Sequence, residues 1–292
     1  MADGKRALVL GGGGPVGIAW EAALLAGLAD AGVRLVDADC IIGTSAGSVV
    51  GAMVALGRDP REAYAGPGRN ERERPAQSPP DLAPLMAQFM KLFTVERPPE
   101  ELRAEVGAFA LQAQTMPEDE WVGWFAQLLD ASGGAWPERT YMCTAVDAQD
   151  GEFVVWDAAA GVPLHLAVAS SCAVPGIFPP VSIKGRRYMD GGVRSGTCAD
   201  LAAGYEKVAV VALTGGAANS ALPLAEVMRR RFEAELDRIR EAGGEVEVIR
   251  PDEAFAKAIG MNLMDGSLRR RAAELGEGQA KAEAARIGAF WG

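Results

Sequence analysis

One pentapeptide, Gly43-Thr44-Ser45-Ala46-Gly47, has residue types and a spacing that suit nucleophilic chemistry. It lies between an apolar run at 39–42 and small and apolar residues at 48–56, which indicate a strand and a buried helix. A Gly-x-Ser-x-Gly motif between a strand and a helix is typical of a nucleophile elbow, where a sharp turn presents the serine hydroxyl. The flanking glycines avoid collisions with neighbouring backbone, and the helix N-terminus directs free N–H groups toward the serine oxygen. The same small residues also suit a turn that only packs a helix closely on a sheet.

A base is the second requirement of such chemistry, because a serine hydroxyl is a weak nucleophile until a neighbouring group accepts its proton. The chain has one histidine, His165, whose apolar neighbours favour a structural role. Asp190 is the alternative, since it follows the strand-like run 186–189 and precedes two glycines. Asp-Gly-Gly alone is also typical of an ordinary hairpin turn. The residues themselves leave open a Ser–His–Asp triad and a Ser–Asp dyad.

A glycine-rich loop is the third feature. Residues 11–17 read Gly-Gly-Gly-Gly-Pro-Val-Gly, after a predicted strand at 5–10 and before a predicted helix at 18–31. Pro15 suits the first helical position, where its missing N–H costs nothing. The backbone N–H groups of such a loop can face an anion at the start of the helix.

The same loop offers a different interpretation. Gly12, Gly14 and Gly17 fit the dinucleotide-binding pattern G-x-G-x-x-G, and Asp37 follows about twenty residues later, after a possible strand at 33–36. A nucleotide-dependent oxidoreductase is therefore an alternative. Against it, the next strand leads directly into the serine motif, which is unexpected in a nucleotide-binding fold.

Composition limits the classes of partner. The chain has 292 residues with 49% hydrophobic content, enough for one large α/β domain or two smaller ones. The formal net charge of −10 and the pI of about 4.8 argue against nucleic acid and against anionic membrane surfaces as constitutive partners. We therefore expect at most transient contact with a membrane surface.

The cysteines and the chain start bear on location. The four cysteines are far apart without CxxC spacing, and a single histidine leaves little for a Cys/His metal site. Free buried thiols in a reducing compartment, and hence a cytoplasmic location, are expected. The N-terminal residues do not show the pattern expected of a signal peptide. The uncharged runs at 40–57 and 158–183 contain glycines and prolines that argue against membrane spans.

Strands and helices alternate over most of the length, which favours a mainly parallel sheet flanked by helices. Without an internal repeat or a domain linker, we expect a single domain over 1–292. The predicted strands lie at 140–147, 152–157, 206–213 and 245–249, and the predicted helices at 164–171, at 224–242 and within 252–291.

One segment, 66–131, stands apart from this alternation. It begins with a loop at 66–80 that contains four prolines and alternating charges, and amphipathic helices follow. Most of their apolar side chains are expected simply to pack on the core. The alternative hypothesis is a helical, lid-like insertion or acyl-binding wall over the serine. The apolar residues at helical spacing are Leu82, Leu85, Met86, Phe89, Met90 and Phe93, and then Trp121, Trp124, Phe125, Leu128 and Leu129.

Taken together, the motifs resemble the patatin-like phospholipase family. The resemblance rests on Leu10–Gly17, Gly43–Gly47, Ser171–Val181 and Asp190–Gly192, which follow the family's order at consistent spacing over about the first 200 residues. It implies a three-layer α/β/α fold with a mainly parallel central sheet. It also implies hydrolysis of acyl esters, usually of lipids, without a metal or an organic cofactor.

The resemblance also implies roles for individual residues. Ser45 becomes the nucleophile and Asp190 the general base, so that no histidine is needed. The substrate is a lipid or another acyl ester, with phospholipase A, lysophospholipase and esterase activities all open, and a non-catalytic lipid-binding relative is a further alternative. The oxyanion hole is assigned to Gly12, Gly13, Gly14 and Ala46, and the motif-supporting positions are Gly17, Gly43, Gly47, Gly191 and Gly192.

The chain departs from the family pattern at one position. The family's loop usually reads Gly-Gly-Gly-x-Arg/Lys-Gly, and the basic position here is Val16, after a proline that has no N–H to donate. Oxyanion stabilisation would then rely on backbone donors. The sequence does not define the acyl-chain length, the head group, the regiochemistry, the oligomeric state or a role for residues 205–292.

Overall fold

The computed structural model describes residues 2–65, 98–129, 134–213, 223–260 and 263–292. Within them lies an eight-stranded sheet of order β5-β6-β3-β2-β1-β7-β8, in which β4 also pairs with β3. The central strands are mutually parallel, and β4, β5 and β6 add antiparallel pairs at one side. The strands are β1 (Ala2–Leu10), β2 (Cys40–Gly43), β3 (Thr140–Asp147), β4 (Phe153–Trp156), β5 (Val181–Ile183), β6 (Arg186–Asp190), β7 (Tyr205–Val211) and β8 (Glu245–Ile249).

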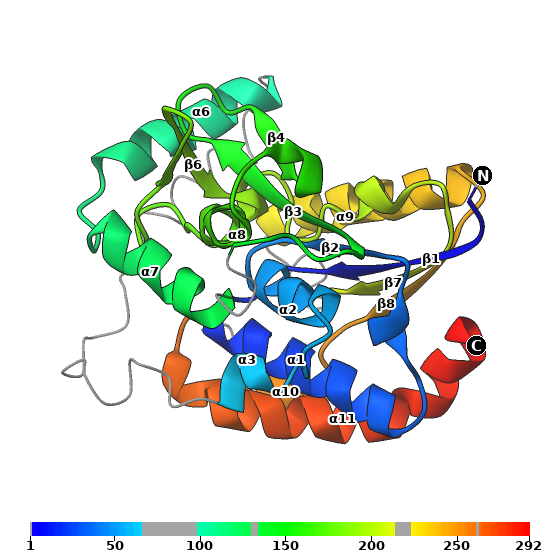
Figure 1. Ribbon diagram of the computed structural model, residues 1–292. Helices are drawn as coiled ribbons and strands as arrows, with labels where there is room; N and C mark the ends of the chain where they lie inside the picture. The colour runs from blue at the N-terminus through cyan, green and yellow to red at the C-terminus, as the bar shows by residue number, and fades with distance from the viewer. Residues whose placement is uncertain (1, 66–97, 130–133, 214–222, 261–262) are drawn as a thin grey trace.

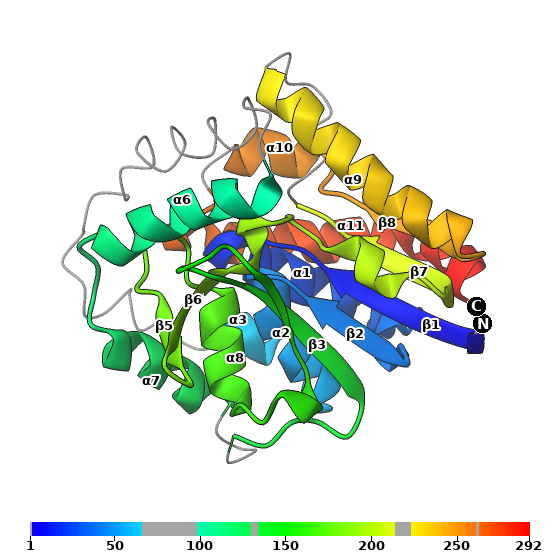
Figure 2. The same ribbon diagram turned by 90° about the horizontal axis from the view of Figure 1, so that it is seen from above.

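Helices cover both faces of this sheet (Figures 1 and 2). The α-helices are α1 (Gly14–Asp30), α2 (Ala46–Ala55), α3 (Glu62–Ala65), α6 (Pro99–Gln112), α7 (Glu118–Leu129), α8 (Leu164–Ser171), α9 (Pro223–Glu241), α10 (Glu253–Ile259) and α11 (Arg269–Trp291). Short 3-10 helices are η1 (Leu35–Asp37), η3 (Ala158–Ala160), η4 (Gly191–Val193), η5 (Ala199–Ala202) and η6 (Gly266–Leu268).

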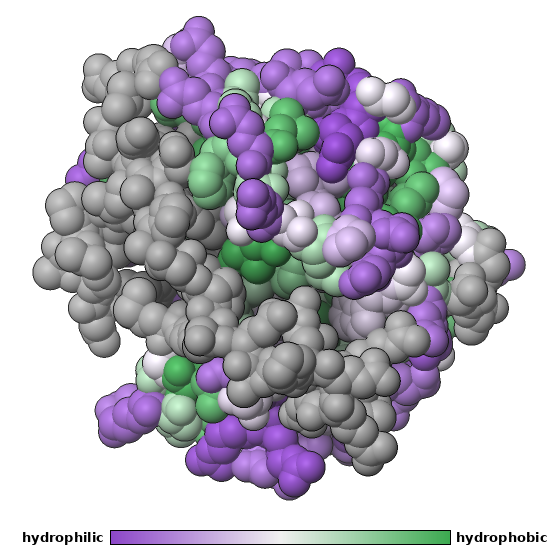
Figure 3. Space-filling view, turned by 90° about the vertical axis from the view of Figure 1, so that its left-hand side faces the viewer, coloured by the Kyte–Doolittle hydropathy of each residue, from purple (hydrophilic) through white to green (hydrophobic). Residues whose placement is uncertain are grey.

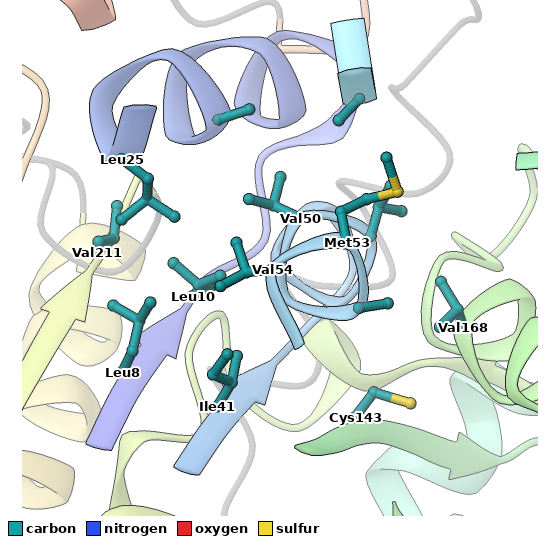
Figure 4. Close-up of a cluster of buried hydrophobic side chains, with 14 of the residues drawn as sticks. Leu8, Leu10, Leu25, Ile41, Val50, Met53, Val54, Cys143, Val168 and Val211 are labelled. Carbon is teal, nitrogen blue, oxygen red and sulfur yellow. The ribbon is translucent and has the colours of Figure 1, made fainter. Parts of the chain in front are cut away.

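The alternation of side chains along each strand builds two cores. Leu8 and Leu10 of β1 point to the face covered by α1 and α2, while Ala7 and Val9 point to the face covered by α9 and η5. Figure 4 shows the first core, where strand residues such as Ile41 gather with side chains of α1 and α2. All of α2 is buried, because small and apolar residues occupy every side of that helix. The three-layer α/β/α fold expected from the sequence is thus confirmed.

The outermost helix of the first face is α11. It packs on α1 at two places where a glycine permits close approach: a Cβ on Gly27 would lie 2.7 Å from Ala280 Cβ, and a Cβ on Gly276 would lie 2.5 Å from the Trp20 carbonyl oxygen. On the other face, α6 covers the ends of β3 and β6 through Leu102 and Val106. These helices close the two sides of the sheet.

The candidate site residues lie together at the edge of the sheet formed by the carboxyl ends of its parallel strands. The carboxyl ends of β1 and β2 lie together, and the glycine loop and the serine motif follow them directly. Strand β6 runs the other way, but its register brings its last residue to the same level: Gly43 pairs with Cys143, and Asp190 pairs with Ala145, two residues further along β3. Figure 3 looks onto this edge and shows apolar surface near its centre beside hydrophilic residues.

Most predicted elements are found, but the possible strand at 33–36 is wrong. The chain turns there and forms η1, because both sides of β1 are already paired with β2 and β7. Asp37 forms an ion pair with Arg34 instead of following a strand. The sequence also missed the short strand β5.

In the segment 66–131, residues 66–97 and 130–131 lie outside the described residues. The described part contains α6 and α7, and α7 confirms the predicted helical stripe at 121–129. Trp121 and Phe125 are buried in the main core, and the Trp121 ring stacks on Phe178 with centroids 3.9 Å apart. This stripe packs on the core, as expected from the sequence for most apolar side chains of the segment.

Two further expectations concern the thiols and the membrane. All four cysteines are free and buried. Among the described helices, none combines the length and the apolar character needed to cross a bilayer.

Candidate active site

Ser45 has a strained backbone. It lies between β2 and the first residue of α2 with φ 52° and ψ −116°, a conformation that side chains rarely adopt. Such a residue costs on the order of 1–3 kcal/mol and persists only where its surroundings enforce it. The sharp turn between strand and helix that the Gly-x-Ser-x-Gly pattern predicts is therefore present at Ser45.

The two motif glycines make this turn possible. A Cβ on Gly47 would overlap the carbonyl oxygen of Leu10 in β1, and a Cβ on Gly43 would lie 2.5 Å from the Gly47 carbonyl oxygen. Helix α2 therefore approaches β1 and β2 more closely than any other residue type at these positions allows. The steric reason given by the sequence for these glycines is confirmed.

Three side chains hold the Ser45 backbone. Its N–H donates to Ser171 Oγ at 3.0 Å, and its carbonyl oxygen accepts from Ser48 Oγ at 2.6 Å and from Cys172 Sγ at 3.1 Å. Burial, and after it the negative charge of Asp190, raises the pKa of the Cys172 thiol, so the thiol keeps the proton that it donates. We call Ser48, Ser171 and Cys172 the elbow clamp.

Sequence reasoning missed the individual roles of the elbow clamp. Ser171 and Cys172 begin the 171–181 motif and lie at the end of α8 (Leu164–Ser171). A signal existed there, because a buried, largely apolar helix offers few partners to polar side chains. Their partner is 126 and 127 residues away along the chain. No local pattern identifies it.

Asp190 is the last residue of β6 and the N-cap of η4. Its N–H donates to Ala173 O at 3.0 Å, and its Oδ1 accepts from Gly192 N at 2.7 Å. Gly191 permits this turn to lie against β3, because a Cβ there would overlap Thr144 Oγ1. Asp-Gly-Gly thus closes a strand against the sheet and is not an ordinary hairpin turn.

The carboxyl group of Asp190 is held in an unusual state. It is 4% exposed, and Oδ2 accepts no hydrogen bond of normal geometry from the described residues. Burial raises its pKa from 3.8 to about 7, against the opposing effects of the Ser45 hydroxyl and the Gly192 N–H. The Ser45 hydroxyl is thus near enough to favour the ionised carboxylate although it makes no short hydrogen bond to Oδ2. A carboxyl with a pKa near 7 is suited to accept a proton at neutral pH.

The glycine loop lies against the same serine. Gly47 N donates to Gly11 O at 2.9 Å, which ties α2 to the loop. A Cβ on Gly12 would lie 3.5 Å from Ser45 Cβ, so the bare Cα of Gly12 faces the serine side chain. The helix α1 begins at Gly14, which puts Pro15 at its second position, one later than expected.

The N–H groups of the loop differ in their availability. Gly12 N donates to Gly196 O at 2.7 Å, so it is already engaged, contrary to its expected place among the oxyanion donors. The N–H groups of Gly13, Gly14 and Ala46 have no acceptor among the described residues. These three are the remaining candidates for binding an oxyanion.

Val16, at the position where the family usually has a basic residue, is fully buried in the main core. Its N–H donates to Leu263 O at 3.3 Å. A charged side chain here would have to enter an apolar region, which is strongly unfavourable. The valine is therefore consistent with its surroundings, and the site has no cation at this position.

His165 is not brought to the serine. It lies in the first turn of α8, six residues before Ser171, which corresponds to about 9 Å along a helix. No hydrogen bond among the described residues links it to Ser45 or Asp190. The geometry does not support a triad that uses this histidine.

Asp37 is also distant from the glycine loop. The neighbouring Asp39 N donates to Arg6 O at 2.9 Å, in the middle of β1, whereas the loop follows the end of β1. Five residues of strand separate these levels by about 16 Å. A ribose-binding acid has to follow the carboxyl end of the second strand, and here that place is taken by Ser45.

Comparison with known families decides the classification. The family model described as Patatin-like phospholipase matches residues 8–203. The chain belongs to the patatin-like phospholipase family. This confirms the resemblance drawn from the four sequence segments, and it places the chain in a family of lipid acyl hydrolases. Helices α9, α10 and α11 lie outside the matched range.

Two solved structures are among those similar to this chain. VipD from Legionella pneumophila has 16% sequence identity and a TM-score of 0.42, covering 97% of this chain and 67% of that one. The type III effector protein ExoU has 16% identity and a TM-score of 0.43, covering 97% of this chain and 53% of that one. This chain thus spans about two thirds and about half of these proteins. A comparison with curated proteins found no match.

Proposed function

We propose that the chain hydrolyses carboxylic esters of lipids through a dyad of Ser45 and Asp190. The observation that carries this proposal is the pairing of a strained, clamped serine with a buried carboxyl whose pKa is raised to about 7. Family membership supports lipid-ester hydrolysis in general. The dyad and the type of ester are our inference.

The first step is attack on the ester carbonyl. Asp190 Oδ2 accepts the hydroxyl proton of Ser45 as Ser45 Oγ forms a bond to the carbonyl carbon. Oδ2 is suited to this role because no described residue occupies it, while Oδ1 is fixed by Gly192 N. The carboxyl is thus oriented by one oxygen and left reactive at the other.

The developing oxyanion needs donors that are already in place. We assign this role to the N–H groups of Gly13, Gly14 and Ala46, near the N-termini of α1 and α2. Collapse of the tetrahedral intermediate expels the alcohol, which takes the proton from Asp190. Water then attacks the acyl-enzyme with Asp190 as the base, and release of the acid restores Ser45.

The substrate preference follows from the donors. Without a cation at position 16, stabilisation rests on backbone N–H groups, and each good donor contributes on the order of 3 kcal/mol to the transition state. We therefore expect a preference for short-chain or activated esters, whose transition states need less stabilisation. Phospholipase A, lysophospholipase and simple esterase activities remain the candidate subtypes.

Covalent labelling tests the proposal. A fluorophosphonate should add one adduct to the wild-type chain, at Ser45, with no adduct on the Ser45→Ala variant, as measured by intact mass and peptide mapping. Asp190→Asn should label far more slowly, and His165→Ala should label and hydrolyse a short p-nitrophenyl ester as the wild type does. Loss of activity in folded His165→Ala would overturn the dyad in favour of a triad. A chain that neither labels nor turns over ester would overturn the proposal in favour of a non-catalytic lipid-binding protein.

A further inference from the structure

A buried carboxylate from outside the family-matched range supports the candidate site. Glu235 lies on α9, and its neighbours Phe232, Leu236 and Ile239 pack on the sheet, so this side of the helix faces inward. Glu235 is 9% exposed. Its Oε2 accepts from Thr197 Oγ1 at 2.8 Å and from Ala199 N at 3.0 Å.

The segment held by Glu235 contacts the glycine loop. Gly196 O accepts from Gly12 N at 2.7 Å. Beside it, a Cβ on Gly11 would lie 3.0 Å from Gly196 O and 3.2 Å from Thr197 Cγ2, so the two segments touch without space between them. A displacement of residues 196–197 must therefore displace Gly11 and Gly12, or break the hydrogen bond between Gly12 and Gly196.

The same segment contacts the residue before the serine. Thr44 Oγ1 lies 2.8 Å from Thr144 Oγ1 and donates to Thr197 O at 3.4 Å. These threonines are at most 1% exposed. Hydrogen bonds thus link Glu235 to the Thr197 hydroxyl, and the Thr197 carbonyl oxygen to Thr44, the residue before Ser45.

Burial of the Glu235 carboxyl group is unfavourable for its charged form, and hydrogen bonds from its neighbours partly offset this cost. Burial raises the pKa of Glu235, the hydrogen bonds from Ser195, Thr197 and the Ala199 N–H lower it, and the negative charge of Asp200 raises it. Asp200 itself is paired with Arg194 and Arg238. An apolar side chain would avoid this cost on a helix that already packs well.

We propose that Glu235 is a positioning residue for the oxyanion hole. It holds residues 195–199 against Gly12 and Thr44, and thereby fixes the direction of the neighbouring N–H groups of Gly13 and Gly14. The catalytic part of this inference rests on the proposed function. Since the oxyanion develops during attack on the ester and is absent from the bound substrate, misdirected donors lower kcat and leave KM unchanged.

The kinetic test compares variants along α9. Glu235→Ala leaves Thr197 Oγ1 and Ala199 N without their acceptor, and kcat on a short ester should fall about 10- to 100-fold with KM within about twofold. Glu235→Gln keeps an acceptor oxygen and should retain kcat within about threefold. Glu233→Ala is the matched control, because Glu233 is a half-exposed residue of the same helix whose ion pair among the described residues is a 3.8 Å contact with Arg250. A wild-type kcat in Glu235→Ala, or an equal loss in Glu235→Ala and Glu235→Gln, would overturn the proposal.

A second measurement does not depend on activity. Hydrogen exchange at Gly12 N–H should be at least about tenfold faster in Glu235→Ala than in the wild type, because its acceptor segment loosens. Exchange at the Ile41 and Ile42 amides of β2 should stay unchanged, and Glu235→Gln should behave as the wild type does. Unchanged protection of Gly12 in Glu235→Ala overturns the inference even if the chain hydrolyses no ester. Increased exchange with no ester hydrolysis by the wild type would overturn the proposed function and leave the positioning of Gly12 by Glu235 standing.

Discussion

The fold constrains Ser45 and Asp190 in opposite ways. At Ser45 the strain lies in the backbone, at φ 52°, while both its N–H and its carbonyl are hydrogen-bonded by the elbow clamp. At Asp190 the backbone is relaxed, at φ −51° and ψ 132°, and the unfavourable energy lies in a desolvated carboxyl. Ser45 thus has a strained but hydrogen-bonded backbone, whereas Asp190 has a relaxed backbone and one carboxyl oxygen, Oδ2, without a hydrogen bond from the described residues.

This difference shows two ways in which a fold can activate a group. Backbone strain presents the Ser45 hydroxyl on a sharp turn without changing its chemistry. Desolvation changes the chemistry of Asp190 itself, since it increases the affinity of the carboxylate for a proton. A substitution that relieves the backbone strain at Ser45 and one that removes the desolvated charge at Asp190 should therefore change stability and activity in different ways.

The largest effect is expected from removing the close approach that permits the elbow. Gly47→Ala places a methyl group onto the Leu10 carbonyl oxygen, and backbone on both sides must move. We expect a loss above about 4 kcal/mol and no cooperative folded state at 37 °C. The control is Gly123→Ala in α7, where no atom lies within 4 Å of the new Cβ. That variant should melt at or slightly above the wild-type temperature by circular dichroism, and a similar melting temperature for Gly47→Ala would contradict the steric account.

Asp190→Asn should exchange activity for stability. Holding ionised a carboxyl whose pKa rises from 3.8 to about 7 costs on the order of 4 kcal/mol above pH 7. Asparagine removes that cost and keeps an oxygen for Gly192 N, so the melting temperature at pH 8 should rise while kcat falls by about 10²–10⁴-fold.

The pH dependence identifies the source of this gain. Between pH 3.8 and about 7 the unfolded chain releases the proton and the folded chain retains it, so wild-type stability falls as pH rises through this range. The advantage of Asp190→Asn should be small at pH 4 and full at pH 8. A lower melting temperature for the variant at pH 8 would mean that the wild-type carboxylate has a stabilising partner.

A smaller effect separates backbone strain from the lost hydroxyl. Ser45→Gly and Ser45→Ala should both be inactive, but glycine tolerates positive φ, whereas alanine does not. The glycine variant should be the more stable of the two by about 1 kcal/mol, the relieved strain being partly offset by the entropy of glycine in the unfolded chain. Denaturant titration of both proteins measures the difference. Equal midpoints would indicate that Ser45 is not strained.

The mildest test changes only the solvent. Because the proposed base must be ionised, kcat/KM should rise about tenfold per pH unit below about pH 7 and level off above it. The same profile is expected for His165→Ala. A profile that shifts in that variant would assign the titration to the histidine.

The sequence predicted those parts of the molecule whose determinants are local. The elbow, β3, β8 and α8 follow from periodicity and from glycines at fixed spacing. The strand expected at 33–36 is absent because β1 is paired with β2 on one side and with β7 on the other. Local sequence propensity does not reveal such long-range strand pairing.

The site shows the same division. Ser45 and Asp190 could be named from their motifs, but Ser171, Cys172 and Glu235 could not, because they act across more than thirty residues. The hydrogen bond from Gly12 N to Gly196 O could not be predicted either, because every residue has a backbone carbonyl oxygen.

The hydrogen bond between Gly12 and Gly196 also governs the order in which a folding chain acquires its chemistry. It closes a loop of more than 180 residues, and the clamp on Ser45 closes another of 126. Helices such as α1 form from local contacts in microseconds, whereas contacts of such long range are established late. A nascent chain that ends before residue 196 can contain both Ser45 and Asp190 and still lack the contact that sets the glycine loop. Secondary structure is therefore acquired well before the geometry of the site.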